Sequence, residues 1–119
     1  MGNLSKHFDR EEFQCKCGKC TPIAVDYELV KVLEDLRMTY GQPITITSSY
    51  RCAKHNKKVG GAKNSKHLIG IAADIVVKNI PARDVAKHLR NFYPNKYGIG
   101  EYEGFTHIDT RKDAARWKG

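Results

Sequence analysis

Two histidines and an aspartate in this chain have the residue types and spacing of a metal-ligand set. His67 and Asp74 are seven residues apart with a glycine and small residues between them, and His107 follows in a later segment. Two imidazoles and one carboxylate leave one position of a tetrahedral zinc ion open, as in hydrolytic rather than structural zinc centres. The pattern predicts a zinc hydrolase, although spacing of this kind also arises by chance.

The chemistry expected at this centre is hydrolysis by a water that zinc activates. Zinc held by the three residues would keep a water in its open position and lower the pKa of that water to about 7. A nearby carboxylate would take the proton and pass it to a leaving amine. Asp109 is one candidate, with an alternative role as the hydrogen-bond partner that fixes the tautomer of a ligand imidazole.

Strand-like segments would position the ligands. The range 72–77 is predicted to be a strand, and Gly70 before it permits a turn that lets the first two ligands converge on one ion. The ranges 97–103 and 104–110 are expected to form two further strands. If the last stretch runs unbroken, a period of two places these residues on one face: Glu101, Glu103, Phe105, His107 and Asp109.

Helices are expected around these strands. The range 9–12 has the spacing of a capping box and should open a short helix. A longer helix with an apolar stripe should begin after Asp26 and end before Gly41. A strand over 43–47 and a helix over 81–92 complete the set.

The irregular order of these elements favours an α+β fold with a small antiparallel sheet flanked by helices. At 119 residues the chain is expected to form a single domain over 1–119, in which 1–25 is a cysteine-containing N-terminal segment. We expect a monomer.

The composition constrains the partners. The chain has 21 basic and 13 acidic side chains and a net charge of +8, which favours polyanions such as an anionic bacterial wall. The basic residues are scattered and no basic helix with interleaved aromatics is present, so nucleic-acid binding is not expected. No apolar window is long enough for a transmembrane segment or resembles a signal peptide. We therefore expect cytoplasmic synthesis and action on the wall after release.

Four cysteines leave three interpretations open. Cys15, Cys17 and Cys20 form a Cys-x-Cys-x-x-Cys pattern, and Cys52 follows much later. They are reduced thiols, disulfides formed after release, or ligands of a second, structural zinc ion. The first spacing is tighter than in usual zinc knuckles. A small zinc protein that binds nucleic acid through these cysteines would leave the histidine and aspartate pattern unexplained.

The segment 65–74 carries a family resemblance. Its sequence matches in full the motif Ser-x-His-x-x-Gly-x-Ala-x-Asp, which marks the zinc D-alanyl-D-alanine carboxypeptidases and related peptidoglycan peptidases. The segment 47–51 resembles the Ser-Gly-Tyr-Arg segment of that family, with Ser49 in place of the usual glycine, and 56–61 continues it. The resemblance extends from about residue 26 to residue 117 and implies a hedgehog-like zinc peptidase fold.

The resemblance implies a role for each matching residue. His67, Asp74 and His107 would be the zinc ligands. Arg51 would bind a carboxylate or carbonyl of the substrate, for which a planar fork of donors is suited, and its alternative role is a structural salt bridge. Ser65 would add a hydroxyl near the same place.

The general base is less clear from the resemblance. Many relatives carry an acidic residue three positions before the last ligand, where this chain has Gly104. Others place a glutamate further upstream, and Glu101 fits that variant best. Glu103 and Asp109 are the reserve candidates.

The function that these expectations favour is hydrolysis of a peptide bond in the peptidoglycan stem peptide, of the D-alanyl-D-alanine carboxypeptidase type, by a phage or prophage lysin. One alternative is an endopeptidase that cuts an L-Ala-D-Glu bond or a cross-link. Another is a wall-binding module that keeps zinc and has lost hydrolysis, which Gly104 would favour.

Overall fold

A five-stranded sheet forms the centre of the computed structural model, which describes residues 3–18, 20–21 and 23–119. The strand order is β1-β2-β4-β3-β5. The strands are β1 (Ile44–Ser48), β2 (Ala72–Val77), β3 (Gly98–Glu101), β4 (Thr106–Asp109) and β5 (Ala115–Lys118). The pairs β1–β2, β2–β4 and β3–β4 are antiparallel, whereas β3–β5 is parallel. The expected α+β class is confirmed, with a parallel edge strand that the sequence did not predict.

Three α-helices and two 3₁₀ turns lie around the sheet within the described residues. They are α1 (Tyr27–Tyr40), α2 (Ala53–Lys58), α3 (Ala82–Phe92), η1 (Arg10–Phe13) and η2 (Lys66–Ile69). The predicted helix after Asp26 is confirmed, with the Asp26 carboxylate accepting from the Leu29 N–H. The capping box around η1 is present as well. The sequence missed α2 and η2, since elements of four to six residues are too short to show helical periodicity.

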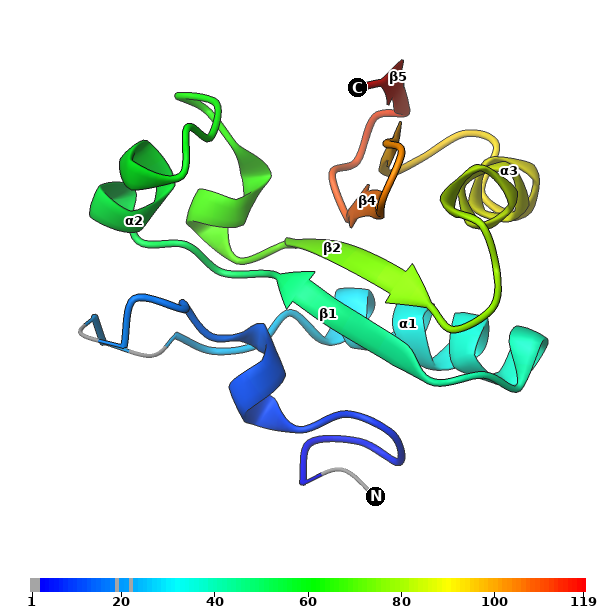
Figure 1. Cartoon of the computed structure of the whole chain (residues 1–119), viewed down its shortest axis with the longest axis horizontal. Coiled ribbons are helices and arrows are strands. Elements are labelled where there is room, and N and C mark those ends of the chain that lie inside the picture. The colour runs from blue at the N-terminus through cyan, green and yellow to red at the C-terminus, as the bar shows by residue number, and fades with distance from the viewer. Residues whose placement is uncertain (1–2, 19, 22) are drawn as a thin grey trace.

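The strand register gives the sheet one apolar face and one polar face. Residues opposite each other in a ladder point to the same side of the sheet, and Ala73 lies opposite Ile108, which in turn lies opposite Ile99. These side chains are fully buried and belong to the core with α1 and α3. In Figure 1, α1 lies behind β1 and β2, and α3 lies beside β4.

The alternate residues form the other face of the sheet. Asp74 lies opposite His107, and His107 lies opposite Gly100. Asp109 follows His107 by two residues and shares its side, where it faces Gly98. Asp74, His107 and Asp109 are therefore gathered on the face away from the main core.

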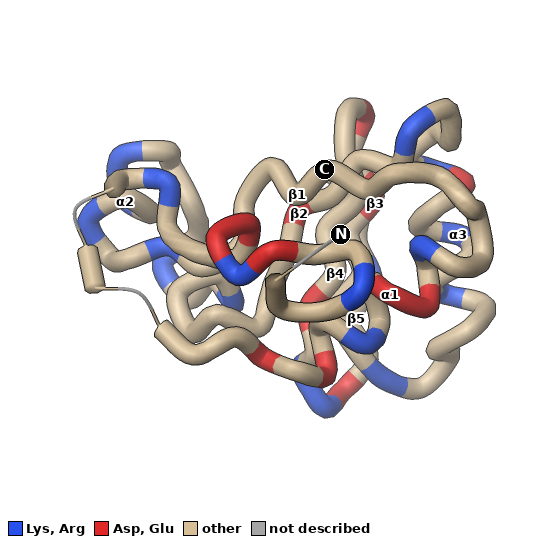
Figure 2. Tube along the Cα trace, turned by 90° about the horizontal axis from the view of Figure 1, so that it is seen from below, with Lys and Arg blue, Asp and Glu red and all other residues tan. Residues whose placement is uncertain are grey.

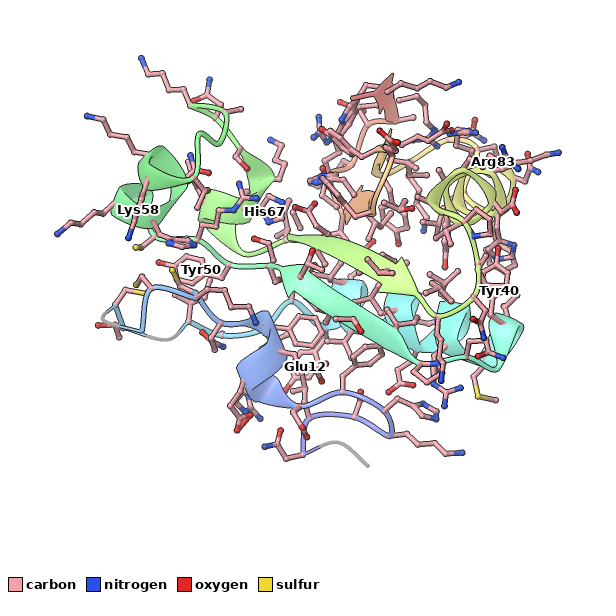
Figure 3. The ribbon with its side chains drawn as sticks, viewed as in Figure 1. Glu12, Tyr40, Tyr50, Lys58, His67 and Arg83 are labelled. Carbon is pink, nitrogen blue, oxygen red and sulfur yellow. The ribbon has the colours of Figure 1, made fainter. Side chains whose placement is uncertain are left out.

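The N-terminal segment is fastened to the core at several points. Phe8 and Phe13 are buried in the core, and the Tyr50 N–H donates to the Phe13 carbonyl after the end of β1. Glu34 on α1 accepts hydrogen bonds from the Ser5 hydroxyl and the His7 N–H. Figure 3 shows η1, marked by Glu12, below β1, with Tyr50 on the path from β1 to α2.

Candidate metal centre

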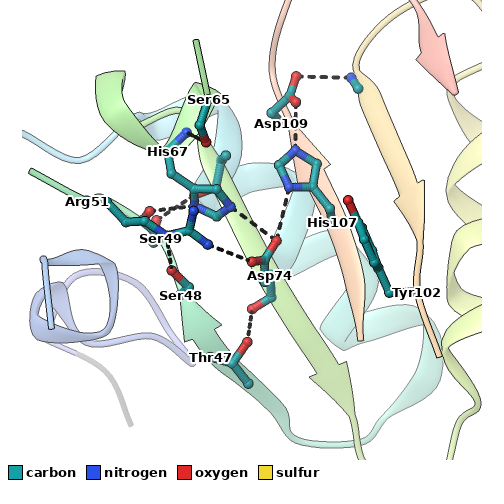
Figure 4. A network of polar contacts seen from close by, with 12 residues as sticks. Thr47, Ser48, Ser49, Arg51, Ser65, His67, Asp74, Tyr102, His107 and Asp109 are labelled. Atoms are coloured by element: carbon teal, nitrogen blue, oxygen red, sulfur yellow. Dashed lines mark hydrogen bonds and ion pairs between the residues drawn. The ribbon is translucent and has the colours of Figure 1, made fainter. Parts of the chain in front are cut away.

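Three side chains from separate elements meet on the polar face of the sheet. His67 lies in η2, Asp74 in β2 and His107 in β4. One ligand atom from each lies within 4.8 Å of the other two, and the residues are 3%, 7% and 8% exposed. Figure 4 shows the two imidazoles approaching the Asp74 carboxylate from opposite sides. The structure therefore brings together the ligand set that the sequence predicted.

The separations between the ligand atoms fit a small tetrahedral cation. His67 Nε2 lies 3.2 Å from Asp74 Oδ1, and His107 Nδ1 lies 3.0 Å from the same oxygen. Nitrogen and oxygen ligands about 2.0–2.1 Å from a tetrahedral zinc ion are about 3.3 Å from each other. The two separations to Asp74 Oδ1 are thus close to those that a zinc ion requires, and the third lies within 4.8 Å.

A second hydrogen bond on each imidazole fixes which nitrogen is available. His67 Nδ1–H donates to the Ser49 carbonyl over 2.6 Å, since a carbonyl oxygen can only accept. His107 Nε2 lies 2.8 Å from the Asp109 carboxylate and donates to it in the same way. The other ring nitrogens, His67 Nε2 and His107 Nδ1, then face Asp74, which is the arrangement found around metal-bound imidazoles.

The charges at this centre favour a cation. Burial acts to raise the pKa of Asp74, but hydrogen bonds from His107 and His67 outweigh it and lower that pKa to about 2. Burial acts to lower the pKa of His107, but hydrogen bonds to Asp109 and Asp74 raise it overall. The donor set fits zinc, because carboxylate and imidazole are ligands that zinc accepts.

Local backbone features hold His67 in place. The Ser65 hydroxyl caps η2 by accepting from the His67 N–H over 3.2 Å, and the His67 carbonyl accepts from the Arg51 N–H. Gly70 ends η2 with a φ of 74°, a conformation that glycine adopts without strain. This is the turn that the sequence predicted before β2.

Asp109 lies behind His107. It is fully buried, receives two hydrogen bonds from the Arg111 guanidinium at 2.8 Å each, and accepts from the Gly98 N–H. Burial opposes these contacts, but hydrogen bonds from Arg111 and His107 lower the pKa of Asp109. This placement fits the alternative stated above, in which Asp109 orients an imidazole.

Glu101, the preferred candidate for the general base, lies on the wrong face of the sheet. It is opposite Thr106 in the β3–β4 ladder and therefore points away from His107. Its carboxylate lies 3.3 Å from Arg90 on α3 and 3.7 Å from Lys118. The assignment of Glu101 is corrected accordingly: the chain reverses between β3 and β4, so the period of two does not continue from Glu101 to His107.

Glu103, a reserve candidate, is exposed in that reversal. It lines hollows with Pro81 and Ala82 rather than the space in front of the ligands.

Arg51 and Ser65 lie beside the ligands as expected. The Arg51 guanidinium donates to Ser48 Oγ over 3.0 Å and to Asn56 Oδ1 over 3.1 Å, and it lies 3.4 Å from Asp74 Oδ2. Arg51 and Ser65 both line the space in front of the ligands. The ion pair between Arg51 and Asp74 leaves both expected roles of Arg51 available, because the guanidinium has five N–H groups.

A cavity of about 400 Å³ opens onto the three ligands. One wall is the segment 59–67, and the opposite wall carries aromatic side chains: Tyr102, Phe105 and Trp117. Asp74 is the only carboxylate among the described residues that line it. Tyr102 and Trp117 were not expected from the sequence, since β5, which carries Trp117, was not predicted.

Tyr102 lies beside His107 (Figure 4), and its hydroxyl accepts from the Trp117 indole N–H over 2.9 Å. The phenolic proton is therefore available to another acceptor.

A comparison with protein-family models matches residues 6–109 to the model for peptidase M15. A search of curated proteins finds no match. Within the part of the chain that the structure describes, no helix has the length and apolar character needed to cross a membrane.

Proposed function

The chain belongs to the peptidase M15 family, and on that premise we propose that it is a zinc metallopeptidase of the D-alanyl-D-alanine carboxypeptidase type that acts on the peptidoglycan stem peptide. The observation that supports this most strongly is the convergence of His67, Asp74 and His107 on an open cavity. Zinc bound there would polarise a scissile carbonyl and lower the pKa of a bound water to about 7.

Side chains on the cavity walls would orient the substrate. The Arg51 guanidinium offers a planar fork that suits the terminal carboxylate of a peptide. The Ser65 hydroxyl, which accepts from the His67 N–H, still has its own proton to donate to the substrate. On the opposite wall, Tyr102 would donate its phenolic proton to the oxygen that becomes negative as the carbonyl is attacked.

Asp109 acts through His107 in this proposal. Its carboxylate keeps His107 Nε2 protonated, so that Nδ1 faces the metal position. It is a positioning residue because it does not line the cavity.

Recognition of a terminal carboxylate separates a carboxypeptidase from an endopeptidase. We expect cleavage of peptides that end in D-Ala-D-Ala with a free carboxylate, and a kcat/KM about 10²-fold lower for the same peptides with an amide end. Arg51→Gln should remove this preference, whereas the exposed Arg83→Gln should keep it. Equal cleavage of free and amidated ends would instead favour the endopeptidase.

The test of the activity itself is digestion of purified peptidoglycan, with and without a chelator, followed by mass spectrometry of the fragments. Chelator-sensitive loss of one terminal alanine supports the proposal. Separation of cross-linked stem peptides, or release of whole stem peptides from the glycan, would instead indicate an endopeptidase.

A second candidate, a zinc-containing wall-binding module without hydrolysis, is favoured by one observation. Asp74 is the only carboxylate among the described residues that line the cavity, so a separate carboxylate base is missing there. Sedimentation with purified walls, zinc bound and no fragment released would support this candidate and exclude the enzyme.

The net charge of +8 supports attachment to an anionic wall, and in that setting we propose the role of a lysin. Figure 2 shows Lys and Arg positions gathered around α2 and on further parts of the surface. Attachment to walls should weaken as salt is raised, since exposed charges are screened.

A further inference from the structure

Four cysteines, one of which directly follows Arg51, form a second group of side chains suited to bind a metal. One sulfur from each of Cys15, Cys17, Cys20 and Cys52 lies within 4.8 Å of the other three. No disulfide joins these four described residues. In Figure 3, yellow sulfur atoms lie near the labelled Tyr50 and Lys58. Residues more than thirty positions apart in the sequence thus bring four soft ligands to one place.

The distances between these sulfur atoms match a metal tetrathiolate. Cys52 Sγ lies 3.8 Å from Cys15 Sγ and 3.8 Å from Cys17 Sγ. A disulfide would require about 2.0 Å. Four sulfurs at about 2.3 Å from a tetrahedral zinc ion are about 3.8 Å from each other. We propose that Cys15, Cys17, Cys20 and Cys52 bind a second, structural zinc ion.

The surroundings of the sulfurs suit thiolates. The Cys52 N–H donates to Cys15 Sγ, and the His55 N–H donates to Cys52 Sγ, each over 3.4 Å. Lys16, Lys54 and Lys58 line the hollow at the cluster. Four thiolates around Zn²⁺ carry a net charge of −2, which nearby lysines and backbone N–H groups offset.

The ion would fasten the N-terminal segment to the residues next to the catalytic cavity. Cys52 is the N-cap of α2 and directly follows Arg51, whose guanidinium contacts Asp74. Cys15 meets this point through the hydrogen bond from the Cys52 N–H, and just before it in the chain the Phe13 carbonyl accepts from the Tyr50 N–H. A zinc ion with four protein ligands has no open position, so its role is to hold structure.

The first experiment measures zinc per chain by elemental analysis of full-length protein purified with zinc. The double variant His67→Asn/His107→Asn removes two ligands of the other centre and should retain one zinc ion per chain. Adding Cys17→Ser and Cys20→Ser should bring the content close to zero. The control substitution Lys58→Ala changes a residue that lines the hollow at the cysteines but is not one of the proposed ligands. Added to the histidine double variant, it should leave the zinc content unchanged.

The histidine double variant also separates this proposal from the proposed peptidase. One zinc ion in that variant supports the cysteine site whether or not the wild-type protein cuts peptidoglycan. Three results would overturn the proposal. They are the absence of zinc in that variant, the presence of iron instead of zinc, and a mass lower by two or four hydrogens, which would indicate disulfides.

A spectroscopic measurement covers the case in which the cysteine variants do not fold. Cobalt(II) loaded into the histidine double variant should give the strong thiolate-to-metal charge-transfer absorption of a tetrahedral cobalt thiolate. A thiol-blocking mercurial should release one equivalent of metal, which a colorimetric chelator quantifies. Absence of the charge-transfer band would contradict a site made of four sulfurs.

Discussion

The two hydrogen bonds behind the imidazoles determine how the metal centre works at the level of single residues. His67 Nε2 and His107 Nδ1 face Asp74 because the other nitrogen of each ring is held by Ser49 or Asp109. The sequence suggested this role for Asp109 as an alternative, and the buried contact with Arg111 now gives it a physical basis.

We predict that Asp109→Asn weakens zinc binding at the histidine centre by about 10- to 100-fold. An amide can present its NH₂ group to His107 Nε2, which favours the tautomer with the proton on Nδ1. Competition with a fluorescent zinc chelator measures the effect, best in a variant without the cysteine cluster. Asp113→Asn, at an exposed position, is the matched control and should leave the affinity unchanged.

We predict that Tyr102→Phe lowers kcat by about 10²-fold while zinc content stays the same, because it removes one donor to the developing oxyanion. Steady-state kinetics on a D-Ala-D-Ala peptide and elemental analysis provide the two readouts. Tyr27→Phe, on a side chain in contact with solvent, serves as control. A Tyr102→Phe variant with full kcat would exclude this role of the phenol.

The convergence of His67, Asp74 and His107 could be predicted from sequence because their spacing is a local motif plus one histidine. The residue that forms a hydrogen bond with each imidazole could not be predicted, since its position depends on the strand register. The sequence favoured Glu101 as the base and kept Asp109 in reserve, yet the reversal between β3 and β4 turns Glu101 toward Arg90 and leaves Asp109 behind His107. Tyr102 was missed because its position depends on Trp117 in β5.

In strand β3, the side chains of Asp109 and Arg111 lie so close to the backbone that only glycine fits at position 98. A Cβ at Gly98 would lie 2.4 Å from Asp109 Oδ2 and 2.6 Å from Arg111 Nε. We predict that Gly98→Ala destabilises the fold by about 1–3 kcal/mol and weakens zinc binding, because the Asp109 carboxylate must move. Urea unfolding and zinc titration measure both effects.

Gly104→Ala is the matched control for that change, since a Cβ at Gly104 meets no atom within 4 Å. Its free energy of unfolding should stay within about 0.5 kcal/mol of the wild type. Equal destabilisation by the two substitutions would indicate that the contact with Asp109 does not limit residue 98.

The attachment of the N-terminal segment to α1 should depend on pH. Burial acts to raise the pKa of Glu34, but hydrogen bonds from Ser5 and His7 lower it below the ordinary value of 4.5. A carboxyl with a lowered pKa in the folded state stabilises the protein above pH 4.5, and this contribution is lost as the pH falls toward the folded-state pKa.

We therefore predict that Glu34→Gln costs about 1–2 kcal/mol at pH 7 and progressively less as the pH falls below 4.5. Urea unfolding at a series of pH values measures this difference. Asp35→Asn, on the same helix but half exposed, should show a much smaller effect at each pH. A loss for Glu34→Gln that is equal at all pH values would rule out the charge as its cause.

The main helices and four strands could be predicted because caps and apolar periodicity are local signals. The limits of β2 agree with the sequence prediction, and Asp26 caps α1 as expected. Strand β5 was missed because its residues alternate little in burial and gain their strand conformation from parallel pairing with β3. Such pairing is a long-range property that a single sequence segment does not carry.

In the whole molecule, the candidate metal centre and the proposed cysteine site hold different parts of the chain together. The first joins η2 to the sheet strands β2 and β4, and the second joins the N-terminal segment to α2. Ions that bind only the folded state stabilise it, and each saturable site adds to the dependence of stability on ligand concentration.

This separation gives a quantitative prediction. At free zinc concentrations above the dissociation constants of both sites, each tenfold rise in free zinc should raise the free energy of unfolding by about 1.4 kcal/mol per site. The wild type, with two sites, should therefore gain about 2.8 kcal/mol. Urea unfolding in zinc buffers measures this slope. The variants His67→Asn/His107→Asn and Cys17→Ser/Cys20→Ser should each show half of it, because one site remains in each. A zero slope in the first variant contradicts the cysteine site, and a zero slope in the second contradicts zinc binding at His67, Asp74 and His107.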